Sequence, residues 1–236
     1  MAGTIIYSAD KIFTGTNWLY DHVVVVENGT IEKVIPVSSL PENGATEHFP
    51  GCLISPAFID LQIYGAHKRL FAVYPDAGSL QKLKEYCNGG GAAYCLPTVA
   101  TNRSTVFYSC IDAIKDYWEK GGEGILGLHI EGPWINAIKR GAHIESLIHS
   151  PTVKEVTELL KYGNGVIKMI TLAPEVCSTE VIDTIQSYRI VISAGHSNAT
   201  YKQAIGGFDN GIRGSFKDVQ SLPRESHGTR NSVGKN

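Results

Sequence analysis

Residues 125–131 are Ile-Leu-Gly-Leu-His-Ile-Glu, and Gly-Pro-Trp follows at 132–134. Side chains alternate along a strand, so Gly127, His129 and Glu131 share one face of this run, and the bulky apolar residues share the other. A carboxylate on the inner face of a sheet is costly unless it is paired or bound to a cation. The run therefore predicts a buried strand that ends in an ion-paired or metal-binding acid.

Similar runs recur on both sides of this strand. They lie at 53–64, 92–99, 166–173 and 189–195. Stretches with apolar residues at three- and four-residue spacing separate them; one of these stretches begins after Ser150-Pro151-Thr152 and ends at Gly163. Five strand–helix units in a row predict an α/β fold with a parallel sheet, either a barrel or an open doubly wound sheet.

The first 52 residues have a different pattern. Three β-branched runs lie at 4–7, 21–27 and 30–35, and Glu27-Asn28-Gly29 predicts a hairpin turn between the last two. Pro41-Glu42-Asn43-Gly44 predicts another turn. We therefore expect a small antiparallel β module, part of a β-sandwich, over residues 1–52.

Two further segments complete the predicted organisation. Residues 53–212 hold the five strand–helix units and should form a partial (β/α) barrel. Residues 213–236 have few apolar residues and no periodicity, so we expect a disordered polar tail.

The overall composition excludes some classes of partner. The 236 residues carry a formal net charge of −2, which gives no electrostatic basis for binding nucleic acid or an anionic membrane. No apolar run approaches the roughly 20 residues that span a bilayer, and the N-terminus lacks the form of a signal peptide. The five cysteines have no metal-binding spacing, which predicts buried free thiols in a cytoplasmic protein.

Polar residues at strand ends are the candidate site residues, because the loops of a parallel barrel converge there. The fifth run leads into Gly195-His196, where the glycine permits a sharp turn and His196 faces the barrel mouth. Carboxylate and neutral imidazole are common ligands of catalytic zinc, so Glu131 and His196 are candidates. The alternatives are a buried ion pair for Glu131 and a capping or substrate contact for His196.

Three other polar positions are more ambiguous. His129 lies one layer below Glu131 and is better explained as a hydrogen-bonded core histidine than as a ligand. Glu175, after the fourth run, suits a salt bridge slightly better than a site. Thr98 and Thr101 end the second run and suit turns and caps.

Several blocks of the sequence resemble the N-acetylglucosamine-6-phosphate deacetylase family of the amidohydrolase superfamily. Most amidohydrolases have two metal-binding histidines after Pro-x-Phe-Ile-Asp on the first barrel strand, and Gln62 and Tyr64 stand at those positions. The deacetylases usually have Asp-x-Gln-x-Asn-Gly there, so Gln62 fits and Tyr64 departs mildly. The other blocks in register are Leu128 to Asn136, Lys139 to His143, Leu172 to Glu175 and Ser193 to Thr200.

The resemblance implies a TIM-type barrel and a metal-dependent hydrolysis of N-acetylglucosamine 6-phosphate, a small-molecule substrate. Glu131 and His196 would bind one divalent ion, most simply zinc, and Gln62 would line the metal pocket. Ala142 and His143 would contact the sugar. It further implies a homodimer for the intact family member.

His129 and Glu175 would then orient the metal-binding residues without touching the metal. The family's third metal-binding histidine, catalytic aspartate and phosphate-binding residues belong to later strands and have no counterpart here. We therefore expect about five of eight barrel units, exposed apolar edge strands that self-associate, and no detectable deacetylation by the chain alone. The alternatives are a non-catalytic fragment that binds a sugar phosphate or a partner chain, and another amidohydrolase such as a dihydroorotase.

Overall fold

The structure is a computed structural model of the chain, and it describes residues 3–40 and 45–215. The chain divides into two compact units, Met1–Phe58 and Ile59–Asn236. The boundary expected between residues 52 and 53 falls inside a strand, Ala45–Ile54, so the division lies a few residues later than the composition suggested. Each unit is described by itself below.

The first unit is a five-stranded sheet with the order β2-β1-β3-β4 and with β5 paired to β1. Its strands are β1 (Thr4–Phe13), β2 (Trp18–Leu19), β3 (His22–Glu27), β4 (Thr30–Pro36) and β5 (Ala45–Ile54), and a 3₁₀ helix, η1 (Val37–Ser39), follows β4. The small core of this unit contains Ile6, Val23 and Val25. Alternating β-branched residues place these side chains on one face of the sheet.

The expected turns and strand directions hold for part of this sheet. Asn28 and Gly29 join β3 to β4 with φ of 52° and 79°, the left-handed conformation that a two-residue hairpin turn requires. The pairs β1–β2, β1–β3 and β3–β4 are antiparallel, but β5 runs parallel to β1. Turn signals define only local hairpins, and they say nothing of the direction of a partner about 40 residues away. The turn predicted at 41–44 lies outside the described residues.

The second unit contains a six-stranded sheet with the order β13-β12-β11-β10-β9-β6. Its strands are β6 (Phe58–Ile63), β9 (Ala92–Ala100), β10 (Leu128–Glu131), β11 (Ile167–Leu172), β12 (Val191–Ala194) and β13 (Gly214–Ser215), and a separate hairpin contains β7 (Gly65–Ala66) and β8 (Arg69–Leu70). The pairs from β9 to β13 are all parallel, which confirms the predicted α/β fold class. The third run is shorter than predicted, although Ile125 still forms a parallel bridge to Cys95.

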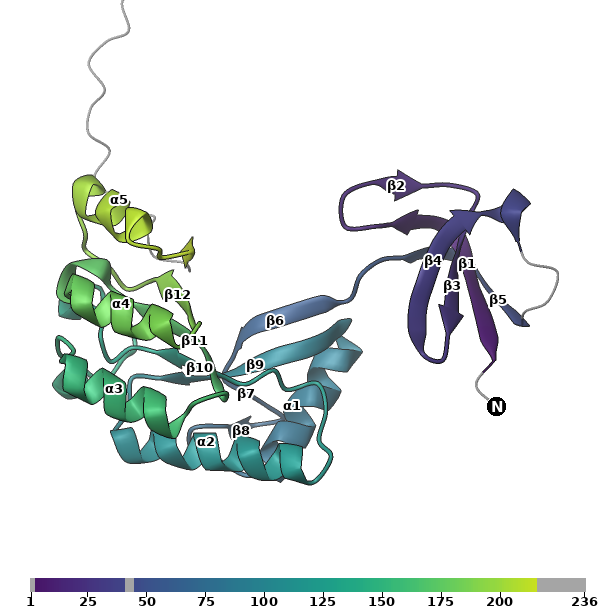
Figure 1. Ribbon diagram of the computed structural model, residues 1–236. Helices are drawn as coiled ribbons and strands as arrows, with labels where there is room; N and C mark the ends of the chain where they lie inside the picture. Colours follow the sequence, from purple (N-terminus) through teal and green to yellow (C-terminus); the bar gives the residue numbers. More distant parts are fainter. Residues whose placement is uncertain (1–2, 41–44, 216–236) are drawn as a thin grey trace, which may run out of the picture. The chain divides into compact units, whose positions relative to one another are not determined.

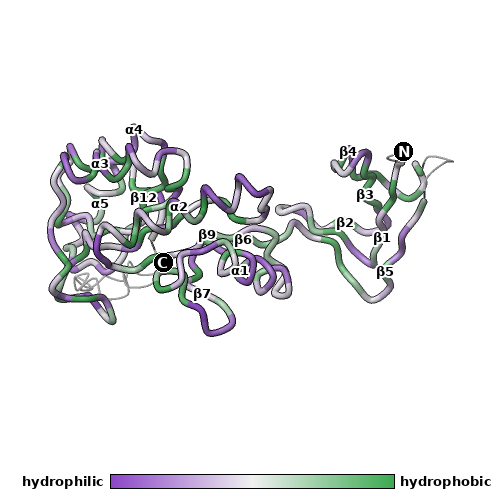
Figure 2. Tube along the Cα trace, turned by 90° about the horizontal axis from the view of Figure 1, so that it is seen from below, coloured by the Kyte–Doolittle hydropathy of each residue, from purple (hydrophilic) through white to green (hydrophobic). Residues whose placement is uncertain are grey.

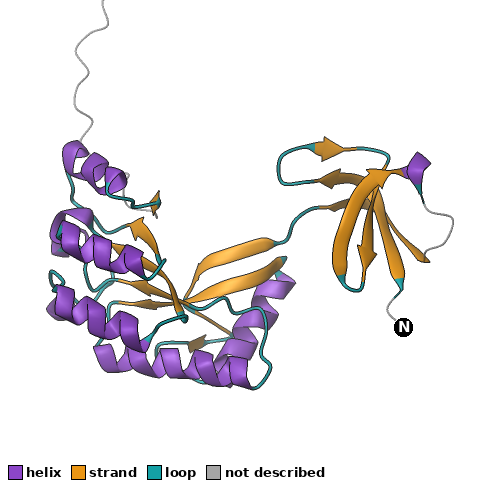
Figure 3. Cartoon of the chain, viewed as in Figure 1, coloured by secondary structure: helices purple, strands orange, loops and turns teal. Residues whose placement is uncertain are grey.

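Helices alternate with these strands and cover one face of the curved sheet (Figures 1 and 3). They are α1 (Ala77–Gly89), α2 (Ser104–Glu119), α3 (Val153–Tyr162), α4 (Thr179–Ser187) and α5 (Tyr201–Asp209), with short 3₁₀ helices η2 (Ala137–Lys139), η3 (Glu145–Leu147) and η4 (Pro174–Val176). Figure 2 shows apolar and polar stretches alternating along the helices, as amphipathic packing requires. The described part of the chain places no helix on the opposite, concave face (Figure 1).

Side-chain caps that the sequence predicts mark the starts of α3, α4 and α5. The Thr152 side chain accepts a hydrogen bond from the Glu155 amide at the start of α3, and Ser178 does the same for Val181 at the start of α4. Thr200 and Gln203 form a reciprocal capping box at α5. The apolar faces of these helices bury residues such as Leu160 and Ile185 against the sheet.

Two expectations about the chain need correction. Residues 213–215 were assigned to the polar tail, but the Arg213 amide donates to the Ile192 carbonyl and Gly214–Ser215 pairs with β12 as a sixth parallel strand. Two residues are too few to show a strand period in the sequence. The rest of the predicted tail, 216–236, lies outside the described residues.

The second correction concerns the cysteines. All five are free, as predicted, yet Cys52 is exposed rather than buried.

Within the described ranges, every helix is too short or too polar to cross a bilayer.

Candidate metal centre

Glu131 is the last residue of β10 and only 3% exposed. Its carboxylate lies among polar side chains from three other segments, which contribute Gln62 and Tyr64, His143, and His196. Burial by itself would raise the pKa of Glu131, but hydrogen bonds from His196 and Tyr64 and the proximity of His143 outweigh it and lower the pKa to about 2. Glu131 is therefore a fixed negative charge in a site with little access to water.

His196 follows β12 and points back at this carboxylate. Its Nε2 lies 3.0 Å from Oε1 of Glu131, and its Nδ1 lies 2.9 Å from the carbonyl oxygen of Lys139. A carbonyl can only accept, so Nδ1 carries a proton, and Nε2 donates to the ionised Glu131 carboxylate in the metal-free chain. Nε2 is the atom that would bind a cation once it gives up that proton. This arrangement matches the usual support of a metal-binding histidine.

The turn that orients the His196 side chain is made at His196 itself and not at Gly195, where the sequence predicted it. Gly195 was expected to make the sharp turn. Instead, the φ angle of His196 is 49°, in the left-handed region, and the φ angle of Gly195 is not in that region. A left-handed conformation at a non-glycine residue costs on the order of 1 kcal/mol and is concentrated at functional sites. The backbone strain thus falls on the candidate ligand.

His143 completes the cluster from the loop between η2 and η3. It is 7% exposed, its Nε2 lies 3.9 Å from Glu131 Oε1, and its ring packs edge-on against His196. The backbone amide of Thr101 donates to His143 Nδ1 at 3.3 Å, and the Thr101 hydroxyl lies 2.7 Å from the same atom. Because Nδ1 accepts a hydrogen bond, the proton of the neutral ring is on Nε2, which faces the cluster.

The charge state of His143 agrees with this assignment. Burial, and then the neighbouring His196, lower the pKa of His143, and the attraction of Glu131 only partly opposes them. The ring is therefore neutral at neutral pH and presents an N–H donor toward the space beside Glu131 and His196.

The three side chains have the geometry of a metal site. One ligand atom from each of Glu131, His143 and His196 lies within 4.8 Å of the others. Two imidazoles and one carboxylate form a donor set found at catalytic zinc. Loss of the Nε2 proton would leave His196 a neutral ring with its lone pair toward a metal, because its Nδ1 proton stays on the Lys139 carbonyl. The same loss would leave His143 an anionic ring, because its Nδ1 accepts from the Thr101 amide, so His143 is better suited to donate a hydrogen bond.

Gln62 and Tyr64 close the cluster on the side of β6. Gln62 Nε2 donates to Glu131 Oε1 at 3.1 Å and to the Tyr64 hydroxyl at 2.7 Å, and the Tyr64 hydroxyl donates to Glu131 Oε2. Burial first, and then the hydrogen bond and charge of Glu131, raise the pKa of Tyr64, so its hydroxyl remains protonated. The structure thus brings Gln62 to the predicted pocket.

The remaining candidates lie around this cluster. His129 is fully buried, and its ring nitrogens lie 2.9 Å from the Leu61 carbonyl oxygen and 2.8 Å from the Thr171 hydroxyl. Its contacts join β6, β10 and β11 beneath Glu131. Ala142 is exposed beside His143.

Glu175 organises the loop that carries His196. Its carboxylate accepts hydrogen bonds from the Asn136 side chain at 3.0 Å, the Ser197 hydroxyl at 2.7 Å and the Asn198 amide at 2.6 Å. It makes no salt bridge among the described residues, so the structure does not support the ion pair that the sequence slightly favoured. Its partners come instead from the segment after β10 and from the two residues that follow His196.

Two contacts of the site were missed by sequence reasoning. Thr101 was interpreted as a turn former, yet it fixes the tautomer of His143. Tyr64 was noted only as a departure from a family pattern, yet it holds one oxygen of Glu131. Neither residue type has a spacing signal of its own, and only the i, i+2 relation of Gln62 and Tyr64 on one strand face pointed toward the site.

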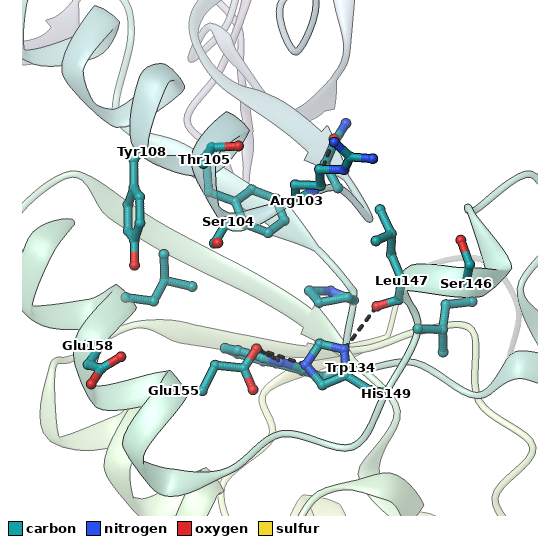
Figure 4. Close-up of a pocket in the computed structure, with 15 residues that line it drawn as sticks. Arg103, Ser104, Thr105, Tyr108, Trp134, Ser146, Leu147, His149, Glu155 and Glu158 are labelled. Carbon is teal, nitrogen blue, oxygen red and sulfur yellow. Dashed lines mark hydrogen bonds and ion pairs between the residues drawn. The ribbon is translucent and has the colours of Figure 1, made fainter.

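A cavity of about 800 Å³ lies beside the start of α2, and none of the three residues of the metal cluster lines it. Figure 4 shows Arg103, Ser104 and Thr105 on one side of this cavity and the His149–Glu155 pair across from them. His149 Nε2 lies 2.8 Å from Glu155 Oε1. The cavity is therefore separate from the candidate chemistry, despite its size.

Comparisons with known proteins identify relatives of this chain. Residues 9–54 match the family described as the NagA composite domain. The chain is 31% identical over 200 residues to N-acetylglucosamine-6-phosphate deacetylase from Haemophilus influenzae, an alignment that covers 85% of this chain and 52% of that protein. It is 28% identical over 216 residues to N-acetylgalactosamine-6-phosphate deacetylase from Escherichia coli O157:H7, covering 89% of this chain and 55% of the relative.

A solved structure gives the same relationship. The crystal structure of N-acetylglucosamine-6-phosphate deacetylase from Pasteurella multocida matches with a TM-score of 0.82 and 29% identity, covering 90% of this chain and 56% of that one. The chain therefore spans about half the length of the curated relatives and the solved structure that it matches.

A curved parallel sheet with a carboxylate–imidazole cluster at its strand ends, preceded in the sequence by a match to the NagA composite domain, defines the amidohydrolase class of (β/α) barrels. Within that class, the chain belongs to the N-acetylglucosamine-6-phosphate deacetylase family.

Proposed function

We propose that this chain provides the metal-binding part of an active site that hydrolyses the acetamide of N-acetylglucosamine 6-phosphate to glucosamine 6-phosphate and acetate. The observation that carries the proposal is the convergence of Glu131, His196 and His143 within 4.8 Å at the ends of parallel strands. The family relationship supplies the reaction class. The compartment proposed for this reaction is the cytoplasm.

Glu131 and His196 are proposed as the protein ligands of one zinc ion. A bound divalent ion supplies two effects there: it lowers the pKa of a bound water to about 7 and polarises the amide carbonyl. The protein contributes the fixed charge of Glu131 and the Nε2 atom of His196, which the Lys139 carbonyl orients.

His143 is proposed as a substrate contact. Its Nε2–H faces the cluster, and the Thr101 amide and hydroxyl hold its Nδ1 from behind. A neutral imidazole that donates from Nε2 can hold a sugar hydroxyl or acetamide oxygen beside the metal. Ala142, exposed on the same loop, would contact the sugar through its backbone or methyl group.

Hydrolysis also requires a group that takes a proton from water and delivers it to the leaving nitrogen. Among the described residues, the cluster contains a single carboxylate, Glu131, and we propose that it is committed to the metal. The isolated chain should therefore bind metal and substrate but turn over the substrate too slowly to detect, since loss of a general base costs about 10²–10⁴ in rate.

The test uses the purified chain loaded with zinc. Saturation-transfer NMR should show contact with the acetyl methyl group of N-acetylglucosamine 6-phosphate, and chelation of zinc or Glu131→Gln should abolish it. The 6-phosphate of N-acetylgalactosamine serves as the comparison for sugar identity, because one relative is named for it. Preference for dihydroorotate, or sugar-phosphate binding that is the same with and without zinc, would refute the proposal. Release of acetate would show that a proton acceptor lies within this chain.

A further inference from the structure

Both carboxylate oxygens of Glu131 have defined partners, and the partners differ in kind. Oε1 faces His196 Nε2 at 3.0 Å and His143 Nε2 at 3.9 Å. Oε2 accepts the hydrogen bond of the Tyr64 hydroxyl. The two imidazoles thus share one oxygen, and a tyrosine holds the other.

This division limits how a cation can bind. A cation held by His196 Nε2 would meet Oε1 of Glu131, while Oε2 is turned toward Tyr64. A hydrogen bond from a hydroxyl to a carboxylate is charge-assisted and about twice as strong as a neutral one. Rotation of the carboxylate to bind a cation through both oxygens would break that bond.

Tyr64 is itself held in place. Its hydroxyl accepts from Gln62 Nε2 at 2.7 Å, and the same amide donates to Glu131 Oε1 at 3.1 Å. Gln62 is in β6 and Tyr64 directly follows that strand, so the rigid sheet sets the position of both. The three side chains form a closed triangle of hydrogen bonds on the side of Glu131 that faces β6.

We propose that Tyr64 is a positioning residue of the metal centre, which fixes the Glu131 carboxylate so that it binds a single divalent cation through Oε1 alone. The inference rests on the proposed metal-dependent function and deepens it. Tyr64 touches neither the reacting atoms nor the cation and acts through Glu131. Outer residues of this kind typically change metal affinity by about 10–100-fold when they are removed.

The first test compares zinc affinity in three forms of the full chain: wild type, Tyr64→Phe and Tyr94→Phe. Tyr94 is a matched control, because it is an exposed tyrosine on the neighbouring strand β9. Competition with a chromophoric chelator should show about 10–100-fold weaker binding for Tyr64→Phe and wild-type binding for Tyr94→Phe. The absorption bands of bound Co²⁺ should shift only in Tyr64→Phe.

A double-mutant cycle separates positioning from a general structural effect. If Tyr64 acts through Glu131, then Tyr64→Phe should cause no further loss of Co²⁺ or zinc affinity in the Glu131→Gln background. An equal loss in both backgrounds would overturn the proposal. So would wild-type affinity together with an unchanged Co²⁺ spectrum in Tyr64→Phe.

A second measurement needs no variant and remains decisive if Tyr64→Phe does not fold. A crystal structure of the zinc-loaded wild-type chain should show zinc on Oε1 of Glu131, with the Tyr64 hydroxyl still on Oε2. Binding through both oxygens, or direct ligation by Tyr64, would overturn the inference while leaving the proposed function intact. Failure of the wild-type chain to bind any divalent cation would instead contradict the proposed function.

Discussion

The Nε2 atom of His196 lies 3.0 Å from Oε1 of Glu131, although 65 residues separate the two positions in the chain. Glu131 ends β10 and His196 follows β12, with β11 lying between these strands in the sheet. The two side chains therefore meet across the end of β11. The left-handed backbone at His196 and the contact of its Nδ1 with the Lys139 carbonyl orient the imidazole toward Glu131.

Glu175 should matter for metal binding although it lies outside the cluster. Glu175→Ala removes three hydrogen bonds that hold Asn136, Ser197 and Asn198 around His196. We expect zinc affinity to fall by about 10-fold or more, because the imidazole loses its fixed orientation. Glu180→Ala, an exposed glutamate in the first turn of α4, is the control and should leave zinc affinity unchanged. Equal affinities in the two variants would show that the loop holds His196 without Glu175.

The metal-free chain should lose stability in acid partly through Glu131. Its pKa of about 2 lies below the ordinary value of 4.5, so its contribution to stability is present above about pH 4.5 and is lost as the pH falls toward 2. The full contribution is on the order of 3 kcal/mol. Urea unfolding of wild type and Glu131→Gln from about pH 6 to about pH 3 should show a steeper decline for wild type. Parallel curves would mean that Glu131 titrates normally in the folded chain.

The sequence predicted those parts of the fold that depend on local patterns. The helix over Val153–Tyr162 was bounded by a capping threonine and a glycine, and both boundaries appear in the structure. The parallel sheet followed from the alternation of apolar runs with amphipathic ones. The two-residue strand β13 and the parallel pairing of β5 with β1 carry no such pattern, since the first is too short and the second depends on residues far apart.

The site shows the same limit for side chains. Glu131 and His196 were predicted because charged or metal-binding residues at strand ends are uncommon and costly. Their metal-binding roles stay predictions. Tyr64 and Thr101 act through single hydrogen bonds that only the folded arrangement defines, and tyrosines and threonines are ordinary at strand ends. Sequence patterns therefore identify charges more readily than the residues that orient them.

Core packing should dominate the stability of the second unit. Ile170, in the middle of β11, is fully buried, and Ile170→Ala should lower the free energy of unfolding by about 2–5 kcal/mol. Ile138 is 76% exposed, and Ile138→Ala should change it by no more than about 0.5 kcal/mol. Chemical denaturation of both variants with the wild type measures the difference. A small loss for Ile170→Ala would mean that the sheet repacks around the missing side chain.

His143 and His196 occupy one cluster but should have different roles, and their variants should separate them. His196 presents Nε2 while Lys139 holds Nδ1, so His196→Gln should weaken zinc binding by about 100-fold or more. His143 is held through Nδ1 by Thr101 and keeps its proton on Nε2, so His143→Gln should bind zinc with nearly wild-type affinity. The same His143→Gln variant should lose the zinc-dependent NMR contact with N-acetylglucosamine 6-phosphate, because it removes the proposed donor to the sugar.

Nitrogen-15 NMR of the metal-free chain should find the His143 proton on Nε2. If His143→Gln instead lost zinc as severely as His196→Gln, His143 would be the third metal ligand, and the hydrogen bonds from Thr101 would serve to orient a metal-binding Nε2.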